Sequence, residues 1–182
     1  MKFEAIQFAD KLGQAVTLRS AEVSDAAALV DYLRITAGET PYLLRGPEEI
    51  TVTPEQEIHF IESKLQEERE LMLVATMNGK HIGNCSLMSH GPFKRTAHRC
   101  EIAIALYREY CGCGIGKVML NTLLAVAKRI GYEQAELEVI SANKGAIALY
   151  KKLGFEEYGT LPRNMKYADG TYADAIFMVK EL

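Results

Sequence analysis

A glycine-dense turn at residues 111–117 carries the most chemistry in this sequence. It reads Cys-Gly-Cys-Gly-Ile-Gly-Lys and separates a β-rich apolar run from a run with helical spacing. Backbone N–H groups at a strand-to-helix turn point toward a bound anion, and glycine permits close approach and positive φ. The turn therefore predicts a phosphate-binding loop, formed by Gly112, Cys113, Gly114, Ile115, Gly116 and Lys117.

Two common phosphate motifs do not fit this turn. A P-loop needs glycine where the chain has Cys111, and Ser or Thr where it has Val118. The dinucleotide pattern G-x-G-x-x-G needs a third glycine, and Lys117 or Met119 occupies that position, depending on the frame. The sequence thus disfavours nucleotide hydrolysis and a Rossmann-type cofactor site.

A second sequence motif lies after the glycine turn, separated from it by one amphipathic run and one β-rich run. Beginning at Asn143, it reads N-x-x-A-x-x-x-Y-x-x-x-G-F and ends at Phe155. Helical spacing places Tyr150 on the same face as Ala146 and Leu153, which directs the phenol inward. Asn143 is also a suitable helix N-cap.

Together the two strings resemble the two signatures of the GCN5-related N-acetyltransferase (GNAT) superfamily. Cys111 departs from the Arg or Gln of that pattern, which removes one polar contact but leaves the backbone donors. The resemblance implies an acetyl-CoA-dependent N-acetyltransferase that needs no metal. It implies two parallel strands, 100–106 and 135–140, that splay apart to receive the cofactor. The implied cofactor contacts are the backbone of Ile104, Ala105 and Leu106, the loop 112–117, and Asn143 and Tyr150.

The resemblance also implies roles in catalysis. Tyr150 is the implied general acid for the departing CoA thiolate, and a neutral phenol is a suitable proton donor. A carboxylate that helps to deprotonate the amine is Glu138 or Glu101, since different branches of the superfamily place their base at one or the other position. Strand alternation leaves open which face meets the substrate. His98 is a third candidate, and an acyl-cysteine route through Cys111 or Cys113 lacks a neighbouring histidine in the sequence.

The elements that position these residues alternate between α and β. We expect one α/β (α+β) domain over residues 1–182, with about four helices on a mixed, mostly antiparallel sheet of six to seven strands. Ser24 is a candidate cap for the first helix, and Thr53, Pro54 and Gln56 form a capping box for the second. Asn78-Gly79 predicts a tight hairpin. The candidate strands are 15–19, 71–77, 80–88, 100–106, 135–140, 155–160 and 173–179, with 3–8 as a candidate extra strand.

Composition limits the partners. A net charge of -3 disfavours nucleic acid, and the absence of a signal-like or membrane-length apolar run leads us to expect a cytoplasmic protein without a membrane partner. The four cysteines match no zinc pattern, and we expect reduced thiols. We leave a homodimer open.

The sequence says less about the amine that accepts the acetyl group than about the cofactor. Residues 39–70 hold nine acidic and three basic residues, a net charge of -6, which suggests a cationic amine or peptide N-terminus unless the charges form a solvated helix face. Small-molecule amines, polyamines and peptide or protein amines all remain candidates. Two other classes also stay open: a non-catalytic acyl-CoA-binding sensor and a purely structural interaction protein.

Overall fold

The computed structural model describes residues 1–182 and contains eight strands and four α-helices. The predicted range of six to seven strands was too low, because the candidate extra strand at 3–8 does form, over residues 6–9, and pairs at the edge of the sheet with the next strand. The strands are β1 (Ile6–Ala9), β2 (Ala15–Ser20), β3 (Leu71–Met77), β4 (Lys80–Ser89), β5 (Arg99–Leu106), β6 (Gln134–Ile140), β7 (Glu156–Lys166) and β8 (Tyr172–Glu181). The helices are α1 (Ala26–Glu39), α2 (Pro54–Gln66), α3 (Ile115–Arg129) and α4 (Lys144–Lys152).

The chain divides into two compact units. The first comprises residues 1–88 and 103–123, and the second comprises residues 89–102 and 124–182. Strand β5 and helix α3 therefore each contribute residues to both units. The expectation of one domain over the whole chain stays a prediction.

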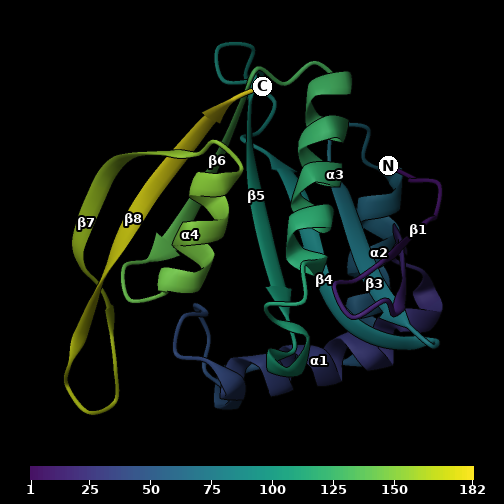
Figure 1. Cartoon of the computed structure of the whole chain (residues 1–182), viewed down its shortest axis with the longest axis horizontal. Coiled ribbons are helices and arrows are strands. Elements are labelled where there is room, and N and C mark those ends of the chain that lie inside the picture. The colour runs from purple at the N-terminus through teal and green to yellow at the C-terminus, as the bar shows by residue number, and fades with distance from the viewer. The chain divides into compact units, whose positions relative to one another are not determined.

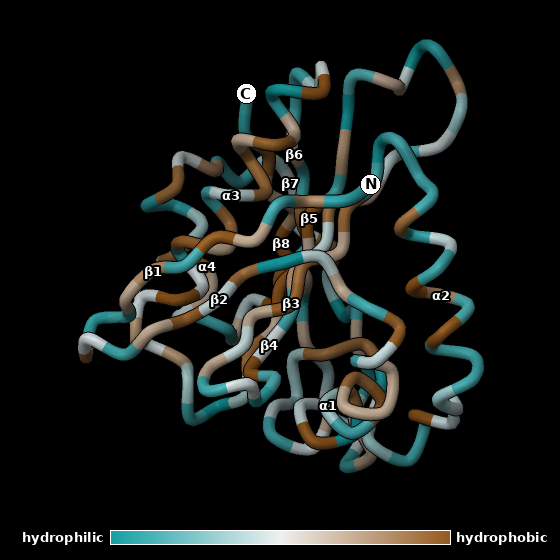
Figure 2. Tube along the Cα trace, turned by 90° about the vertical axis from the view of Figure 1, so that its right-hand side faces the viewer, coloured by the Kyte–Doolittle hydropathy of each residue, from teal (hydrophilic) through white to brown (hydrophobic).

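The first unit is an antiparallel sheet covered by helices. Strands β1, β2, β3 and β4 pair in that order, and the Tyr107 N–H just after β5 donates to the Ile82 carbonyl of β4 at 3.1 Å. Figure 2 shows α1 and α2 on one side of strands β2, β3 and β4. Their apolar stripes meet the sheet in a core of Ala21, Ala26, Leu29, Tyr32, Ile61, Met72 and Val74.

Of the local sequence predictions in this unit, two are confirmed and one was wrong. The Thr53 capping box is confirmed: the Gln56 N–H donates to Thr53 Oγ1 at 3.3 Å, and the Thr53 N–H donates to Gln56 Oε1 at 3.0 Å. Asn78 and Gly79 have φ of 52° and 76°, as a two-residue hairpin turn requires. The Ser24 cap was wrong, because Ser24 lies inside a 3-10 turn, Val23–Asp25, whose N-cap is Glu22.

The second unit begins with the first residues of β5. These pair in parallel with β6 over Arg99–Glu101 and Gln134–Glu136, three of the eight residues of β5. Strand β6 pairs antiparallel with β8, and β8 with β7, so that β7 and β8 form a long curved hairpin (Figure 1). The strand order of the sheet is β1-β2-β3-β4-β5-β6-β8-β7. No helix combines the length and the apolar character that crossing a membrane requires.

A buried aromatic cluster in the first unit contains an unusual histidine. His81 packs edge to face against Tyr32 and Tyr107, with ring centroids 4.7 and 6.3 Å away. Its side chain is buried, and neither ring nitrogen has a hydrogen-bond partner. Burial lowers the pKa of His81 to about 4, since the charged imidazolium loses its hydration. His81 is therefore neutral in the folded protein at ordinary pH.

This histidine should make the fold sensitive to acid. Because its pKa is lower in the folded state than in the unfolded state, the unfolded chain binds more protons, and stability falls as pH drops from about 6.5 toward 4. The full loss is about 3 kcal/mol. Urea unfolding across this range should show a smaller pH dependence for His81→Phe than for the wild type. His59→Gln, a change at an exposed side chain, should keep the wild-type profile. Equal slopes for His81→Phe and wild type would contradict the assignment.

Candidate functional site

The glycine turn of the sequence has the backbone that its composition predicted. Gly112 and Gly114 have φ of 82° and 88°, in the left-handed region where other residues are strained. Helix α3 begins directly afterwards, at Ile115. The backbone conformation therefore requires glycine at these two positions. This conformation sets the direction in which α3 begins.

The N–H groups of this turn are free to bind an anion. None of the five from Gly112 to Gly116 donates to a backbone carbonyl of the protein, and the first turn of α3 holds no acidic residue that would compete with an anion. The carbonyls of the turn, in contrast, are occupied: Lys11 N–H donates to Cys113 O at 2.9 Å, and Lys11 Nζ to Gly112 O at 3.3 Å. Consecutive free donors at a helix start suit a diphosphate.

Lys11 was missed by the sequence reasoning. It lies in the turn between β1 and β2, about one hundred residues before the glycine turn, and no local motif marks it. Its aliphatic stem also covers Gly114, where an added Cβ would lie 3.2 Å from Lys11 Cγ. Lys11 therefore supports the turn and adds a positive charge beside it.

The end of β5, where the resemblance places the pantetheine arm, lies unusually close to β4. An added Cβ on Gly83 would lie 2.7 Å from the Ala105 carbonyl oxygen and 3.0 Å from Leu106 Cα. That carbonyl accepts a hydrogen bond of 2.8 Å from the hydroxyl of Tyr32 on α1. Gly83 and Tyr32 thus fix the backbone of the segment Ile104–Leu106.

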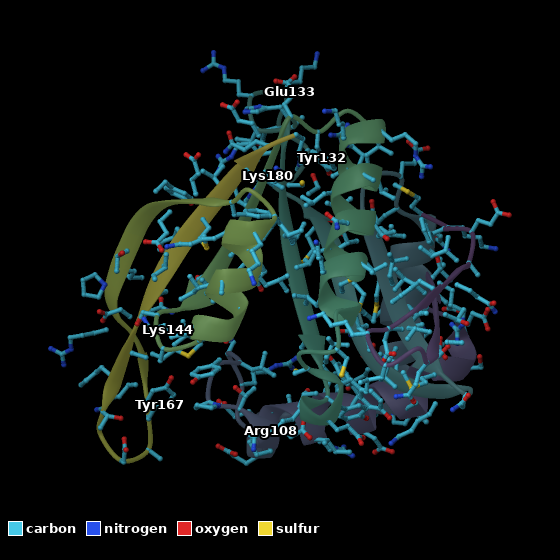
Figure 3. All side chains as sticks on the ribbon, viewed as in Figure 1. Arg108, Tyr132, Glu133, Lys144, Tyr167 and Lys180 are labelled. Carbon is cyan, nitrogen blue, oxygen red and sulfur yellow. The ribbon has the colours of Figure 1, made fainter.

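In the second unit, the other signature residues lie on α4. Asn143 is the N-cap, and its Oδ1 accepts from the Ala146 N–H at 3.2 Å, so the capping interpretation is confirmed. Figure 3 shows Lys144 at this end of α4 and Lys180 of β8 toward the other end. There an added Cβ on Gly154 would lie 2.8 Å from Lys180 Nζ, and the glycine has φ of 86°. The glycine of the signature therefore ends the helix and makes room for a lysine.

Tyr150 is directed inward, as its helical spacing predicted. The residue is 7% exposed, and its ring packs edge to face against Phe155 at 6.0 Å. Its hydroxyl has no hydrogen-bond partner in the protein, yet it is not fully enclosed. Burial raises the pKa of Tyr150 to about 12. The phenol therefore keeps its proton at ordinary pH and is free to donate it to a bound ligand.

Both candidate bases are exposed. Glu138 accepts a hydrogen bond from Asn164 Nδ2 of β7 at 2.8 Å. Glu101 lies directly opposite Glu136 in the β5–β6 register. The weaker candidate, His98, is half-buried, and its carbonyl accepts from the Glu133 N–H at 2.9 Å.

A third carboxylate on these strands is unsuited to act as a base. Glu136 is buried and ion-paired with Arg99, whose guanidinium hydrogen bond is the main cause that lowers the pKa of this carboxyl. Gln134 Nε2 donates a further hydrogen bond at 2.7 Å. With its lone pairs already bound and its affinity for a proton reduced, Glu136 holds the strands together.

The four cysteines are free thiols. Burial is the main cause that raises the pKa of Cys111, which makes a reactive thiolate less accessible. The Cys111 and Cys113 thiols donate hydrogen bonds to backbone carbonyls, of Tyr107 and Cys111 respectively. No group of three or more His, Cys, Asp or Glu residues is placed to hold a metal ion. The raised pKa of Cys111 therefore argues against an acyl-cysteine route through this residue.

Similarity to a known protein spans nearly the whole chain. An N-alpha-acetyltransferase of Sulfurisphaera tokodaii is 28% identical over 189 residues, which cover 97% of this chain and 100% of that protein. With two other curated relatives the match is partial, and the chain spans 42% and 22% of their lengths.

Two solved structures share the fold. An acetyltransferase of the GNAT family from Streptococcus pneumoniae superposes with a TM-score of 0.87 and 27% identity, covering 92% of this chain and 99% of that one. The yncA acetyltransferase of Salmonella typhimurium, solved with its cofactor acetyl-CoA, has a TM-score of 0.81 and 23% identity and covers 92% and 94%. The family model described as "Acetyltransferase (GNAT) family" matches residues 38–155, more than half of the chain, so the chain belongs to this acyltransferase family.

Proposed function

We propose that the protein transfers the acetyl group of acetyl-CoA to a primary amine of a small molecule, polyamine or peptide by direct attack in a ternary complex. The observation that carries this proposal is the row of unpartnered N–H groups from Gly112 to Gly116 at the start of α3. Such a row is costly to leave without an acceptor, and a diphosphate supplies several.

Most of the proposed cofactor contacts are backbone groups. In the first unit, the N–H groups of Gly112–Lys117 bind the diphosphate, and the backbone of Ile104, Ala105 and Leu106 binds the pantetheine amides as an added strand would. The short parallel pairing of β5 with β6 supports this role for the rest of β5. In the second unit, the Asn143 amide nitrogen is available to the cofactor because only its oxygen caps α4.

The proposed reaction has one bond-forming and one bond-breaking step. The neutral amine nitrogen attacks the thioester carbonyl, the N–C bond forms, and the C–S bond breaks to give the amide and CoA. The amine loses a proton, directly or through water, to Glu138 or alternatively to Glu101. Deprotonating an alkylammonium near pH 7.4 costs about 4 kcal/mol, and a nearby carboxylate offsets part of this cost.

Tyr150 is the proposed proton donor to the sulfur. Its pKa of about 12 lies above the value of about 8.5 that is usual for a thiol, so complete transfer to a free thiolate would be uphill. The hydroxyl therefore acts first as a hydrogen-bond donor that stabilises charge as it develops on the sulfur. The phenol regains its proton from solvent or from the base.

Calorimetry and a thiol-release assay test this function together. We expect acetyl-CoA to bind with measurable heat and to raise the melting temperature, and an amine panel to release free CoA above the hydrolysis background. Binding without amine-dependent release would instead favour an acyl-CoA sensor. If neither heat nor stabilisation appeared, both readings would be wrong and an interaction protein would be favoured. A cytoplasmic location and a homodimer stay predictions.

A further inference from the structure

A cleft in the first unit is lined from several segments of the chain. It has a volume of about 340 Å³ and lies between α1, the segment that follows α1, α2, and strands β3 and β4. Much of its wall is apolar, including Phe60, Met72, Leu87 and Met88. Such a wall fits a body of aliphatic, thioether or aromatic groups, and the polar side chains of Gln56, Asn84 and Ser86 also line the cleft.

One carboxylate in this cleft has no partner. Glu57 is 6% exposed and stands one turn before the core residue Ile61 on α2. Its carboxylate makes no hydrogen bond or ion pair within the protein, yet its oxygens are not sealed from the cleft. Burial raises the pKa of Glu57, the sign of a carboxylate whose hydration has been reduced without replacement. A cation in the cleft would restore that lost interaction.

The other charged side chains of the cleft limit the charge that a ligand can carry. Lys64 is ion-paired with Glu70, so its charge is already neutralised. Arg45 also lines the cleft, and its positive charge acts on Glu57 without forming an ion pair with it. A ligand that carries several positive charges would be repelled by Arg45. A ligand with a single ammonium group can pair that group with Glu57 and place no second charge near Arg45.

We infer that, before the acceptor amine is deprotonated, this cleft binds the acceptor as a single primary ammonium group on an apolar body, with Glu57 as its anionic anchor. The inference rests on the proposed acetyltransferase function and specifies its substrate class. It also revises the expectation drawn from the acidic stretch 39–70. Its glutamates 48, 49, 55, 62, 67 and 68 are exposed, and only Glu57 is buried. The net charge of the stretch therefore reflects mainly a solvated surface, and the selective group is one buried carboxylate.

A free amino acid and a peptide N-terminus share this chemistry. Both present an ammonium group beside an apolar side chain, and they differ in whether a free carboxylate follows. Arg45 is the group that would distinguish them, because it offers a cation to that carboxylate. L-leucine and L-leucinamide therefore serve as the two probes, with spermidine as the polycation and 4-methylpentanoate as the analogue that lacks the amine.

The main test is Glu57→Gln, which keeps the shape of the side chain and removes its charge. We expect KM for L-leucinamide to rise about tenfold or more, as loss of a charged hydrogen bond predicts, with a smaller change in kcat and no loss of thermal stability. Glu62→Gln, at an exposed glutamate on the same helix, should behave as the wild type. In the presence of CoA, L-leucine should raise the melting temperature of the wild type but not of Glu57→Gln, and 4-methylpentanoate should raise neither.

The outcomes separate the inference from the proposed function. Unchanged KM values in Glu57→Gln, or a preference for spermidine, would overturn the inference while leaving acetyl transfer intact. If the wild type bound acetyl-CoA but acetylated no amine, the proposed function would fail, and a Glu57-dependent melting shift would still support amine binding in the cleft. An Arg45→Gln change that raises KM for L-leucine alone identifies a free amino acid as the acceptor. Equal effects on both probes identify a peptide end.

Discussion

Replacing Tyr150 with phenylalanine is expected to lower kcat about 100-fold or more, the usual scale for loss of a general acid. The affinity for acetyl-CoA should hardly change, because the ring, its burial and its contact with Phe155 are all retained. Steady-state thiol release measures the first quantity and calorimetry the second. The separation of the two effects is what identifies a role in chemistry rather than in packing.

The control for this change is Tyr132→Phe. Tyr132 is 2% exposed and belongs to the same unit, so the change also removes a hydroxyl group from a buried ring. We expect kcat to stay within about twofold of wild type, since no transition-state contact is removed. Because the pKa of Tyr150 is raised to about 12, its acid form persists below that pH, and kcat should show no alkaline loss due to Tyr150 between about pH 8 and 10. Retention of full activity by Tyr150→Phe would remove the assigned role.

A valine at Gly112 is expected to abolish tight acetyl-CoA binding. The position has φ of 82°, and an added Cβ would meet no atom within 4 Å, so the effect comes from the backbone and not from a steric clash. A β-branched residue avoids positive φ, at a cost of about 1–2 kcal/mol or more. The turn should relax to negative φ and swing its N–H groups away from the diphosphate, raising Kd at least about tenfold.

Gly170→Val provides a matched comparison. Gly170 has φ of 85° and equally open surroundings, but it lies in the turn between β7 and β8. Both variants should lose similar stability in urea unfolding, and only Gly112→Val should lose affinity for acetyl-CoA in calorimetry. Equal affinities for the two variants would show that the turn at 111–117 does not hold the cofactor.

The sequence determined the features that depend on neighbouring residues. The capping box at Thr53, the hairpin turn at Asn78-Gly79, the positive φ of Gly112 and Gly114, and the inward face of Tyr150 each follow from interactions within a few positions of the chain. The two signatures that carry the family assignment are of this local kind. The backbone of the glycine turn and the burial of Tyr150 were therefore predictable from the sequence, and the cofactor contacts themselves stay predictions.

Only the tertiary structure decided which distant side chains act together. Lys11 supports the glycine turn across about one hundred residues, Glu136 is neutralised by Arg99, and His81 is enclosed by Tyr32 and Tyr107. Glu57 looked like one of many surface glutamates until packing placed it in a cleft without a partner. Dihedral preferences and caps are encoded locally, whereas burial and charge pairing depend on which segments pack together, and a single sequence does not specify those contacts.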